Sequence, residues 1–98
     1  MALKIEWTKR ADKKFDTILV YLNEEWGERV TANFVKKVYE FLDVLVEYPE
    51  IGTLEHKQKG VRGFTIVKQV SIFYKVSGNK IILLDFFDTR QNPKKKRF

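Results

Sequence analysis

The chain has 98 residues, the size of one domain, and its 44% apolar and 14% aromatic content is enough for one core, which excludes a largely disordered protein. With no cysteine and one histidine it offers neither a disulfide framework nor a zinc site, and we expect no metal and no cofactor. No segment approaches the ~18 apolar residues of a membrane span, and residues 1–9 lack a signal-peptide pattern. The sequence therefore predicts one cytoplasmic domain over residues 1–98, with a basic tail at about 93–98 and no membrane contact.

The net charge of +6 is spread unevenly along the chain. Residues 1–50 carry eight Lys or Arg against ten Asp or Glu, a net −2, whereas residues 51–98 carry eleven against three, a net +8. A concentrated positive field attracts nucleic acid or an acidic protein segment. Basic surfaces also keep small proteins soluble, but the asymmetry favours a partner.

The first half predicts a strand followed by two helices. Residues 3–7 alternate apolar and charged side chains, as in an edge strand with one face on a core. Thr8 is a candidate helix N-cap, and residues 11–26 carry one apolar stripe that includes Trp26. Gly27 then separates this helix from a second over residues 28–47, so that the two form an antiparallel hairpin.

Five apolar side chains lie off the main stripes of the two helices. They are Val20, Tyr21, Val30, Tyr39 and Val44. We interpret them as part of a broad buried face, because large apolar residues are usually in the core. The alternative is that the outer face of the hairpin docks a partner chain or a second copy in a homodimer.

The second half predicts three strands. They lie within residues 61–68, 71–76 and 81–87, and a Gly78-Asn79 turn joins the last two. The segment 81–87 is apolar almost throughout, which indicates an interior strand. Residues 50–60 are polar, and we expect an irregular loop there. The fold class is α+β, with the order β-α-α-β-β-β and the helical hairpin on one face of a small, mostly antiparallel sheet.

Short motifs follow one another in a fixed order along nearly the whole chain. They are Ala11 and Phe15, Tyr21 and Trp26-Gly27, Phe34, Tyr48-Pro49-Glu50-Ile51-Gly52, Val61-Arg62, Ile72-Phe73-Tyr74, and Asp88-Thr89-Arg90-Gln91-Asn92-Pro93. In this order and spacing the chain resembles the RelE/ParE superfamily, the toxins of bacterial type II toxin–antitoxin systems, which include plasmid stabilisation proteins.

This resemblance implies a growth-inhibiting toxin with one of two actions. RelE-like members are ribosome-dependent endoribonucleases that cut mRNA, whereas ParE-like members inhibit DNA gyrase and are not nucleases. Both are neutralised by an antitoxin with an acidic segment, in agreement with the charge asymmetry. The expected partners are therefore a cognate antitoxin and either the ribosome with its mRNA or DNA gyrase.

The resemblance also implies the site residues. The recurrent arginines of the superfamily fall on Arg62 and Arg90, and Lys57 and Lys59 are candidates for the lysines that assist RNA cleavage. Phe98 lies near the place of a C-terminal tyrosine that stacks on the substrate base. Arginine forks bind phosphate well, so phosphate contact is the expected role of the two arginines.

RNA cleavage through the ribose 2′-hydroxyl needs a group that accepts its proton, and neither arginine is a credible base. His56, or a lysine that loses its proton, is the candidate for this role, although a lone surface histidine is usually idle. Arg62 and Arg90 have a structural alternative, which is to pair with Asp85 or Asp88 at the sheet edge. A different class of function is a non-toxic module that binds RNA or an acidic protein through the basic sheet face.

Overall fold

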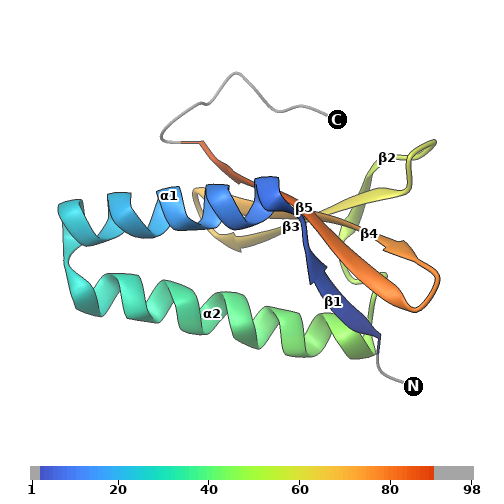
Figure 1. Ribbon diagram of the computed structural model, residues 1–98, viewed down its shortest axis with the longest axis horizontal. Coiled ribbons are helices and arrows are strands. Elements are labelled where there is room, and N and C mark those ends of the chain that lie inside the picture. Colours follow the sequence, from blue (N-terminus) through green and yellow to red (C-terminus); the bar gives the residue numbers. More distant parts are fainter. Residues whose placement is uncertain (1–2, 90–98) are drawn as a thin grey trace.

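The computed structural model describes residues 3–89, and those residues form two helices and five strands. In chain order the elements are β1 (Lys4–Trp7), α1 (Lys9–Trp26), α2 (Glu28–Glu47), β2 (Thr53–His56), β3 (Val61–Val67), β4 (Val70–Ser77) and β5 (Lys80–Asp88) (Figure 1). The predicted order is confirmed, with one additional strand, β2, between the hairpin and the three predicted strands.

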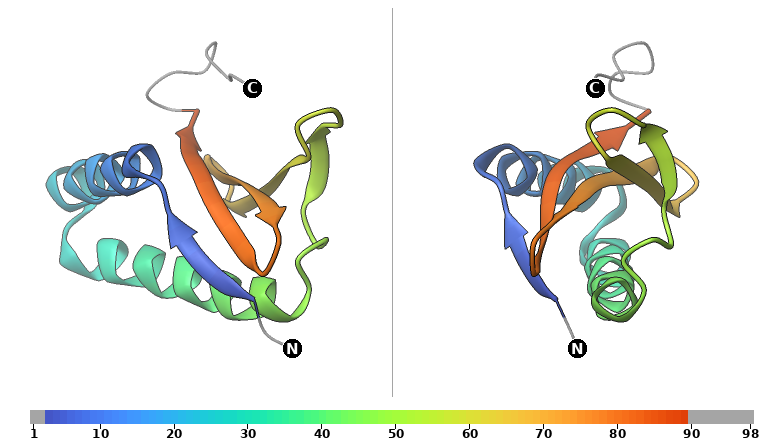
Figure 2. Two further views of the ribbon diagram at one scale, coloured as in Figure 1. Left: turned by 45° about the vertical axis from the view of Figure 1, so that its right-hand side comes forward. Right: turned by 90° about the vertical axis from the view of Figure 1, so that its right-hand side faces the viewer.

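The five strands form one mixed sheet in the order β1-β5-β4-β3-β2. β1 runs parallel to β5, while the other three pairings are antiparallel. Both helices pack on the same face of this sheet, and the two views of Figure 2 show the opposite face without a helix. The predicted α+β class is therefore confirmed, with β5 as an interior strand and β1 as an edge strand.

Local signals fix the two helices. The Thr8 hydroxyl accepts a hydrogen bond from the Ala11 N–H at 3.1 Å and donates one to the Leu83 carbonyl at 2.7 Å, so it caps α1 and ties it to β5. Gly27 separates the helices with a φ of +87°, a backbone angle that favours glycine. Neither helix is apolar enough over its length to cross a membrane.

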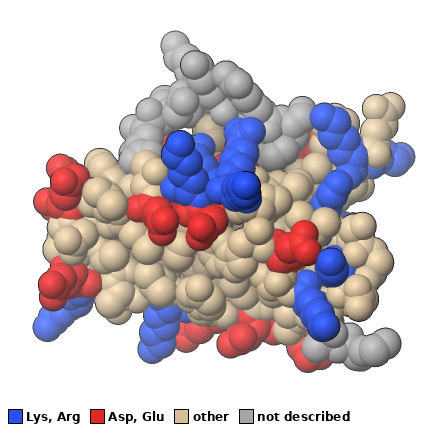
Figure 3. Space-filling model, in the orientation of Figure 1, with Lys and Arg blue, Asp and Glu red and all other residues tan. Residues whose placement is uncertain are grey.

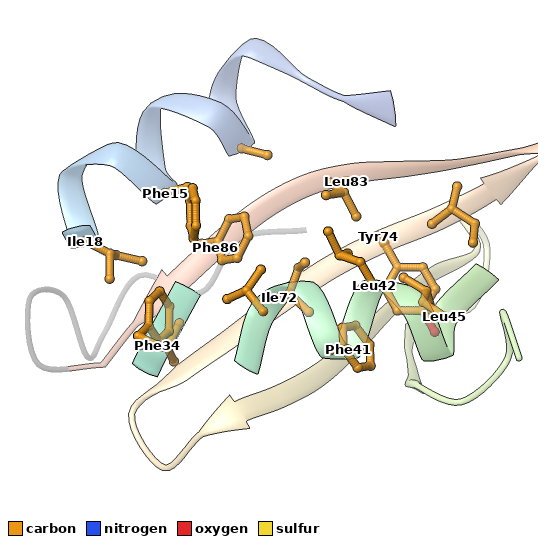
Figure 4. Close-up of a cluster of buried hydrophobic side chains, with 14 of the residues drawn as sticks. Phe15, Ile18, Phe34, Phe41, Leu42, Leu45, Ile72, Tyr74, Leu83 and Phe86 are labelled. Atoms are coloured by element: carbon orange, nitrogen blue, oxygen red, sulfur yellow. The ribbon is translucent and has the colours of Figure 1, made fainter. Parts of the chain in front are cut away.

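The core lies between the hairpin and the covered face of the sheet (Figure 4). It is largely aromatic and aliphatic, and its fully buried members include Ile18, Val38, Leu45, Ile72, Tyr74, Leu83 and Phe86. Phe41 of α2 stacks on Phe64 of β3 with ring centroids 4.3 Å apart, which locks the second helix to the sheet. Each such side chain contributes about 1.5–3 kcal/mol on burial.

The expectation of an irregular loop over residues 50–60 is wrong for its central part. Residues 53–56 form β2, which pairs with β3 through Thr53↔Gly63 and Leu54↔Arg62. Three of the four β2 side chains are exposed, so the strand has no alternating pattern that the sequence could show. Its pairing with β3, not its own composition, makes it a strand.

The expectation of a broad buried face on the hairpin is also wrong. The side chains of Val20, Val30, Tyr39 and Val44 are 40–58% exposed, and Trp26, which we placed on the buried stripe, is 61% exposed. Tyr21 alone among the off-stripe residues is half-buried. Each helix contacts the sheet through one stripe, so the outer positions face solvent.

Candidate functional site

The face of the sheet that carries no helix, here called the open face, has a small apolar floor. Val61, Phe73 and Phe87 form a second buried cluster there, separate from the main core, and Leu84 packs against it half-buried. Gly63 also belongs to this face, because a Cβ at that position would lie 2.7 Å from the Phe73 ring. Leu84 is thus the one member of this group that is more than slightly exposed.

A cavity of about 550 Å³ lies on this face, and we call it the open-face groove. Its lining comes from α1, the β2–β3 turn, β3, β4 and β5, and consists of Thr8, Arg10, Lys59, Val61, Lys75, Leu84 and Asp85. Figure 3 shows Lys and Arg gathered over the N-terminal part of α1 and again toward the tip of the β2–β3 hairpin. The groove therefore combines an apolar floor with a cationic rim.

One carboxylate lies buried at the base of the groove. The Asp85 side chain is 5% exposed, and its Oδ2 lies 3.0 Å from Nη2 of Arg10, whose side chain is 58% exposed. Its Oδ1 lies 3.7 Å from Lys14 Nζ and, among residues 3–89, has no hydrogen-bond partner. The ion pair holds the Arg10 guanidinium at the groove while leaving much of it open to solvent.

An irregularity in β5 puts Asp85 on this face. Phe73 pairs with Asp85, but the next residue, Tyr74, pairs with Leu83, so Leu84 is an extra residue opposite β4. With strict alternation Asp85 would share the core side with Leu83. The bulge instead places Leu84 and Asp85 together on the open face.

Arg62, a predicted catalytic and phosphate-binding residue, lies on the other face. It pairs across the sheet with Tyr74, which is buried in the helix-side core. Its Nη1 donates to the carbonyls of Gly52 at 2.8 Å and Glu50 at 3.3 Å, and it forms no ion pair with Asp85. The guanidinium therefore fastens the segment that follows α2.

Tyr74 completes this fastening, which we call the loop clasp. Its hydroxyl donates to the Pro49 carbonyl at 2.8 Å and accepts from the Gly52 N–H at 2.9 Å. Burial raises the pKa of Tyr74 above its ordinary value, while the Gly52 hydrogen bond and the Arg62 charge act in the opposite direction. The motif residues around Pro49 and Gly52 are thus explained by packing of a loop.

The other predicted site residues are dispersed. The His56 Nδ1 accepts a hydrogen bond from the Lys59 N–H at 3.2 Å, so this ring closes the β2–β3 turn. The Lys59 side chain lines the open-face groove, whereas Lys57 is exposed in the same turn and does not. Arg90 and Phe98 lie outside the described residues.

Arg10, Lys75 and Asp85 are groove residues that sequence reasoning did not propose as functional. For Lys75 a signal existed, because strand alternation placed it with Phe73 on the face opposite Tyr74. The sequence held no such signal for Arg10 or Asp85. Arg10 is an ordinary residue of the first turn of a helix, and the position of Asp85 on the open face depends on the bulge. Within residues 3–89 no three His, Asp or Glu side chains gather as a metal site.

Comparison with known proteins decides the family. A protein-family model, described as the ParE toxin of the type II toxin–antitoxin system parDE, matches residues 5–93. The chain belongs to the ParE toxin family. The resemblance to the RelE/ParE superfamily is thereby confirmed, and this ParE-family chain is the toxin component of a type II toxin–antitoxin system.

Solved structures share the fold of this ParE-family chain. A structure of the chromosomal ParDE system from P. aeruginosa has a TM-score of 0.74 at 21% identity, covering 89% of this chain and 96% of that one. A YoeB/ParE toxin from Agrobacterium tumefaciens has a TM-score of 0.65 at 16% identity, with 88% and 98% covered. The YoeB dimer from Staphylococcus aureus has a TM-score of 0.63 at 19% identity, with 89% and 97% covered. No curated protein sequence matches.

Proposed function

We propose that this ParE-family toxin arrests growth by binding a protein target, DNA gyrase, and that it does not cut mRNA at the ribosome. The observation that supports this proposal is the placement of Arg62 and His56. Arg62 is held in the loop clasp on the helix side of the sheet, and His56 closes the β2–β3 turn. Both are engaged by main-chain atoms.

Cleavage of RNA would require these groups to act together. A proton acceptor, cations around the developing phosphorane and a donor for the leaving oxygen must surround one phosphate. The cations of the open-face groove, Arg10, Lys59 and Lys75, lie on the opposite face of the sheet from Arg62. The described residues therefore do not gather into the constellation that the nuclease interpretation expects.

The proposal includes neutralisation by a cognate antitoxin in the cytoplasm, where gyrase and ribosomes are found. Three of the similar solved structures are described as toxin–antitoxin systems or complexes, from P. aeruginosa, Mycobacterium tuberculosis and E. coli. The +8 charge of residues 51–98 would attract an acidic segment of such a partner. A toxin that acts by binding needs only this kind of surface complementarity, without a catalytic base.

The test follows gyrase activity and mRNA integrity in parallel. Purified protein is added to gyrase and relaxed plasmid, and induced cells are analysed for growth and for mRNA cuts by primer extension. We expect loss of supercoiling and growth arrest with intact mRNA, and we expect co-expression of the antitoxin encoded beside the toxin to restore growth.

A matched variant separates the two mechanisms. Replacing His56→Ala together with Lys57→Ala removes the candidate base and one candidate lysine, and neither residue lines the groove. We expect growth arrest to persist in this variant. Ribosome-dependent cuts in mRNA that vanish in the variant, with gyrase unaffected, would contradict the proposal. No arrest from a folded protein would favour a non-toxic binding module.

A further inference from the structure

An apolar hollow of about 720 Å³ lies at the C-terminal end of α2, apart from the open-face groove. Three of its apolar side chains, Val44, Tyr48 and Ile51, are 41%, 67% and 43% exposed. Single exposed apolar residues are common on protein surfaces, but adjoining ones that line one hollow are typical of an interaction surface. The complete lining, which we call the helix-end patch, consists of Val44, Glu47, Tyr48, Pro49, Glu50 and Ile51.

The loop clasp does not explain the side chains of this patch. The clasp engages main-chain atoms of Pro49, Glu50 and Gly52. The side chains of Tyr48 and Ile51 take no part in those hydrogen bonds and remain exposed. The Ile51 N–H donates to the Tyr48 carbonyl at 3.1 Å, so a closed turn holds the two side chains beside the end of the helix. The apolar surface is therefore built on a fixed backbone, which lowers the entropy cost of binding.

The charge around the helix-end patch is opposite to that of the whole chain. Residues 38–56 contain five Asp or Glu and no Lys or Arg, although the net charge is +6. Figure 3 shows several Asp and Glu side chains along the lower edge of the molecule, toward the C-terminal end of α2. Glu47 and Glu50 are exposed, and within residues 3–89 neither forms an ion pair. The patch thus combines an apolar surface with an acidic rim.

This rim decides between the candidate occupants. Nucleic acid, an anionic membrane and an acidic peptide would all be repelled by the carboxylates. The same patch of a second copy would bring Glu47 and Glu50 against like charges across a two-fold axis. A protein surface that presents Lys or Arg beside an apolar side chain fits both parts of the patch. Its cations pair with the carboxylates and can also pack on the ring of Tyr48.

We propose that the helix-end patch is the surface through which this toxin docks on its protein target, at a basic and partly apolar site of that target. An apolar side chain of the target fills the hollow between Val44 and Ile51. A Lys or Arg of the target packs on the Tyr48 ring and pairs with Glu47 or Glu50. This assignment rests on the proposed binding of gyrase and adds which surface of the toxin meets it.

Binding is measured by biolayer interferometry with immobilised toxin and purified gyrase, and inhibition by the supercoiling assay. We expect Tyr48→Ala and Glu47→Lys/Glu50→Lys each to weaken binding at least tenfold and to raise the half-inhibitory toxin concentration by a similar factor. Tyr48→Phe keeps the ring, so its binding should stay within twofold of wild type. Circular dichroism melts establish that each variant is folded.

The other end of the hairpin provides matched controls. Trp26→Ala removes an aromatic side chain that is 61% exposed, and Glu24→Lys/Glu25→Lys makes the same charge change as the double glutamate variant of the patch. The 20 residues of α2 put about 30 Å between these positions and the helix-end patch. We expect both control proteins to bind gyrase within threefold of wild type.

The outcomes distinguish this inference from the proposed function. Wild type that inhibits gyrase no better than Tyr48→Ala and Glu47→Lys/Glu50→Lys do would overturn the patch assignment alone. Wild type that neither binds nor inhibits gyrase would overturn both proposals. A wild-type dimer that Tyr48→Ala dissociates in size-exclusion chromatography, with gyrase binding unchanged, would show a contact between two copies instead. Patch variants that lose only the antitoxin would show that the antitoxin occupies this surface.

Discussion

The loop clasp and the open-face groove lie on opposite faces of one sheet and use their polar groups in opposite ways. In the clasp, Arg62 and the Tyr74 hydroxyl direct their hydrogen bonds at main-chain atoms of residues 49–52. In the groove, the lysines have no ion pair within residues 3–89 and Asp85 Oδ1 has no donor. A polar side chain is a good candidate for binding when its hydrogen-bonding capacity remains unused.

This difference separates most of the family motif residues from the groove. The residues that carry the resemblance around Pro49, Gly52, Arg62 and Tyr74 meet in the clasp, where they hold the chain as it passes from α2 to β2. Their contacts explain their spacing without a ligand. Apart from Val61, the groove is lined by residues that such motifs do not include, among them Arg10 and Asp85. Substitutions at the two places should therefore have different effects, on stability at one and on partner binding at the other.

The largest effect on stability should come from Gly52. A Cβ there would lie 2.7 Å from the Tyr74 hydroxyl oxygen and 2.9 Å from the Gly63 carbonyl oxygen. Because the second neighbour is backbone, Gly52→Ala forces the clasp apart, and we expect a loss of about 3 kcal/mol in the free energy of unfolding. Urea denaturation measures it.

The double variant Gly52→Ala/Tyr74→Phe is the control for this prediction. It removes the hydroxyl that the new methyl group would meet while leaving the Gly63 carbonyl in place, so the two losses should be less than additive. A Gly52→Ala protein within about 0.5 kcal/mol of wild type would contradict the tight packing of the clasp.

Arg62→Ala should lower stability without changing toxicity. The carbonyls of Gly52 and Glu50 lose their charged donor, for which we expect about 2 kcal/mol in urea denaturation. At matched amounts of folded protein, growth arrest should equal that of wild type. Arg62→Lys keeps the charge but not the planar fork, so its stability should lie between that of wild type and that of Arg62→Ala. Loss of toxicity in a folded Arg62→Ala protein would show that Arg62 acts directly in toxicity and not only in the clasp.

The sequence was sufficient for the features that depend on neighbours along the chain. The helix over residues 28–47, the Thr8 cap and the Gly78 turn all follow from periodicity, capping and turn chemistry. Such signals act over a few residues, so a single sequence displays them. They determine most of the fold.

The features that the sequence alone could not predict depend on contacts between residues that are not neighbours in the chain. β2 exists because β3 pairs with it, and Asp85 reaches the groove because of a bulge set by the pairing of β5 with β4. The contacts of Arg62 with residues ten and twelve positions away are equally invisible in composition or spacing. The face of the sheet on which each of these side chains lies could therefore be assigned only from the structure.

The smallest effect, and the one with a pH signature, should come from Tyr74→Phe. This variant leaves the Pro49 carbonyl and the Gly52 N–H without their partner, which we expect to lower stability by about 1.5 kcal/mol at neutral pH. Tyr48→Phe removes a hydroxyl from a side chain that is 67% exposed and serves as the control, with an expected change below about 0.5 kcal/mol.

The difference between wild type and Tyr74→Phe should shrink in alkali. Burial raises the pKa of Tyr74, so the folded protein holds this proton more tightly than the unfolded chain does. Above about pH 10 the unfolded chain begins to lose the proton first, and the stability of wild type falls as pH rises. Phenylalanine has no such proton, so the variant lacks this loss. A difference that stays constant or widens between neutral pH and about pH 10.5 would mean that the hydroxyl is not buried in the clasp, because only burial makes the folded state resist its ionisation.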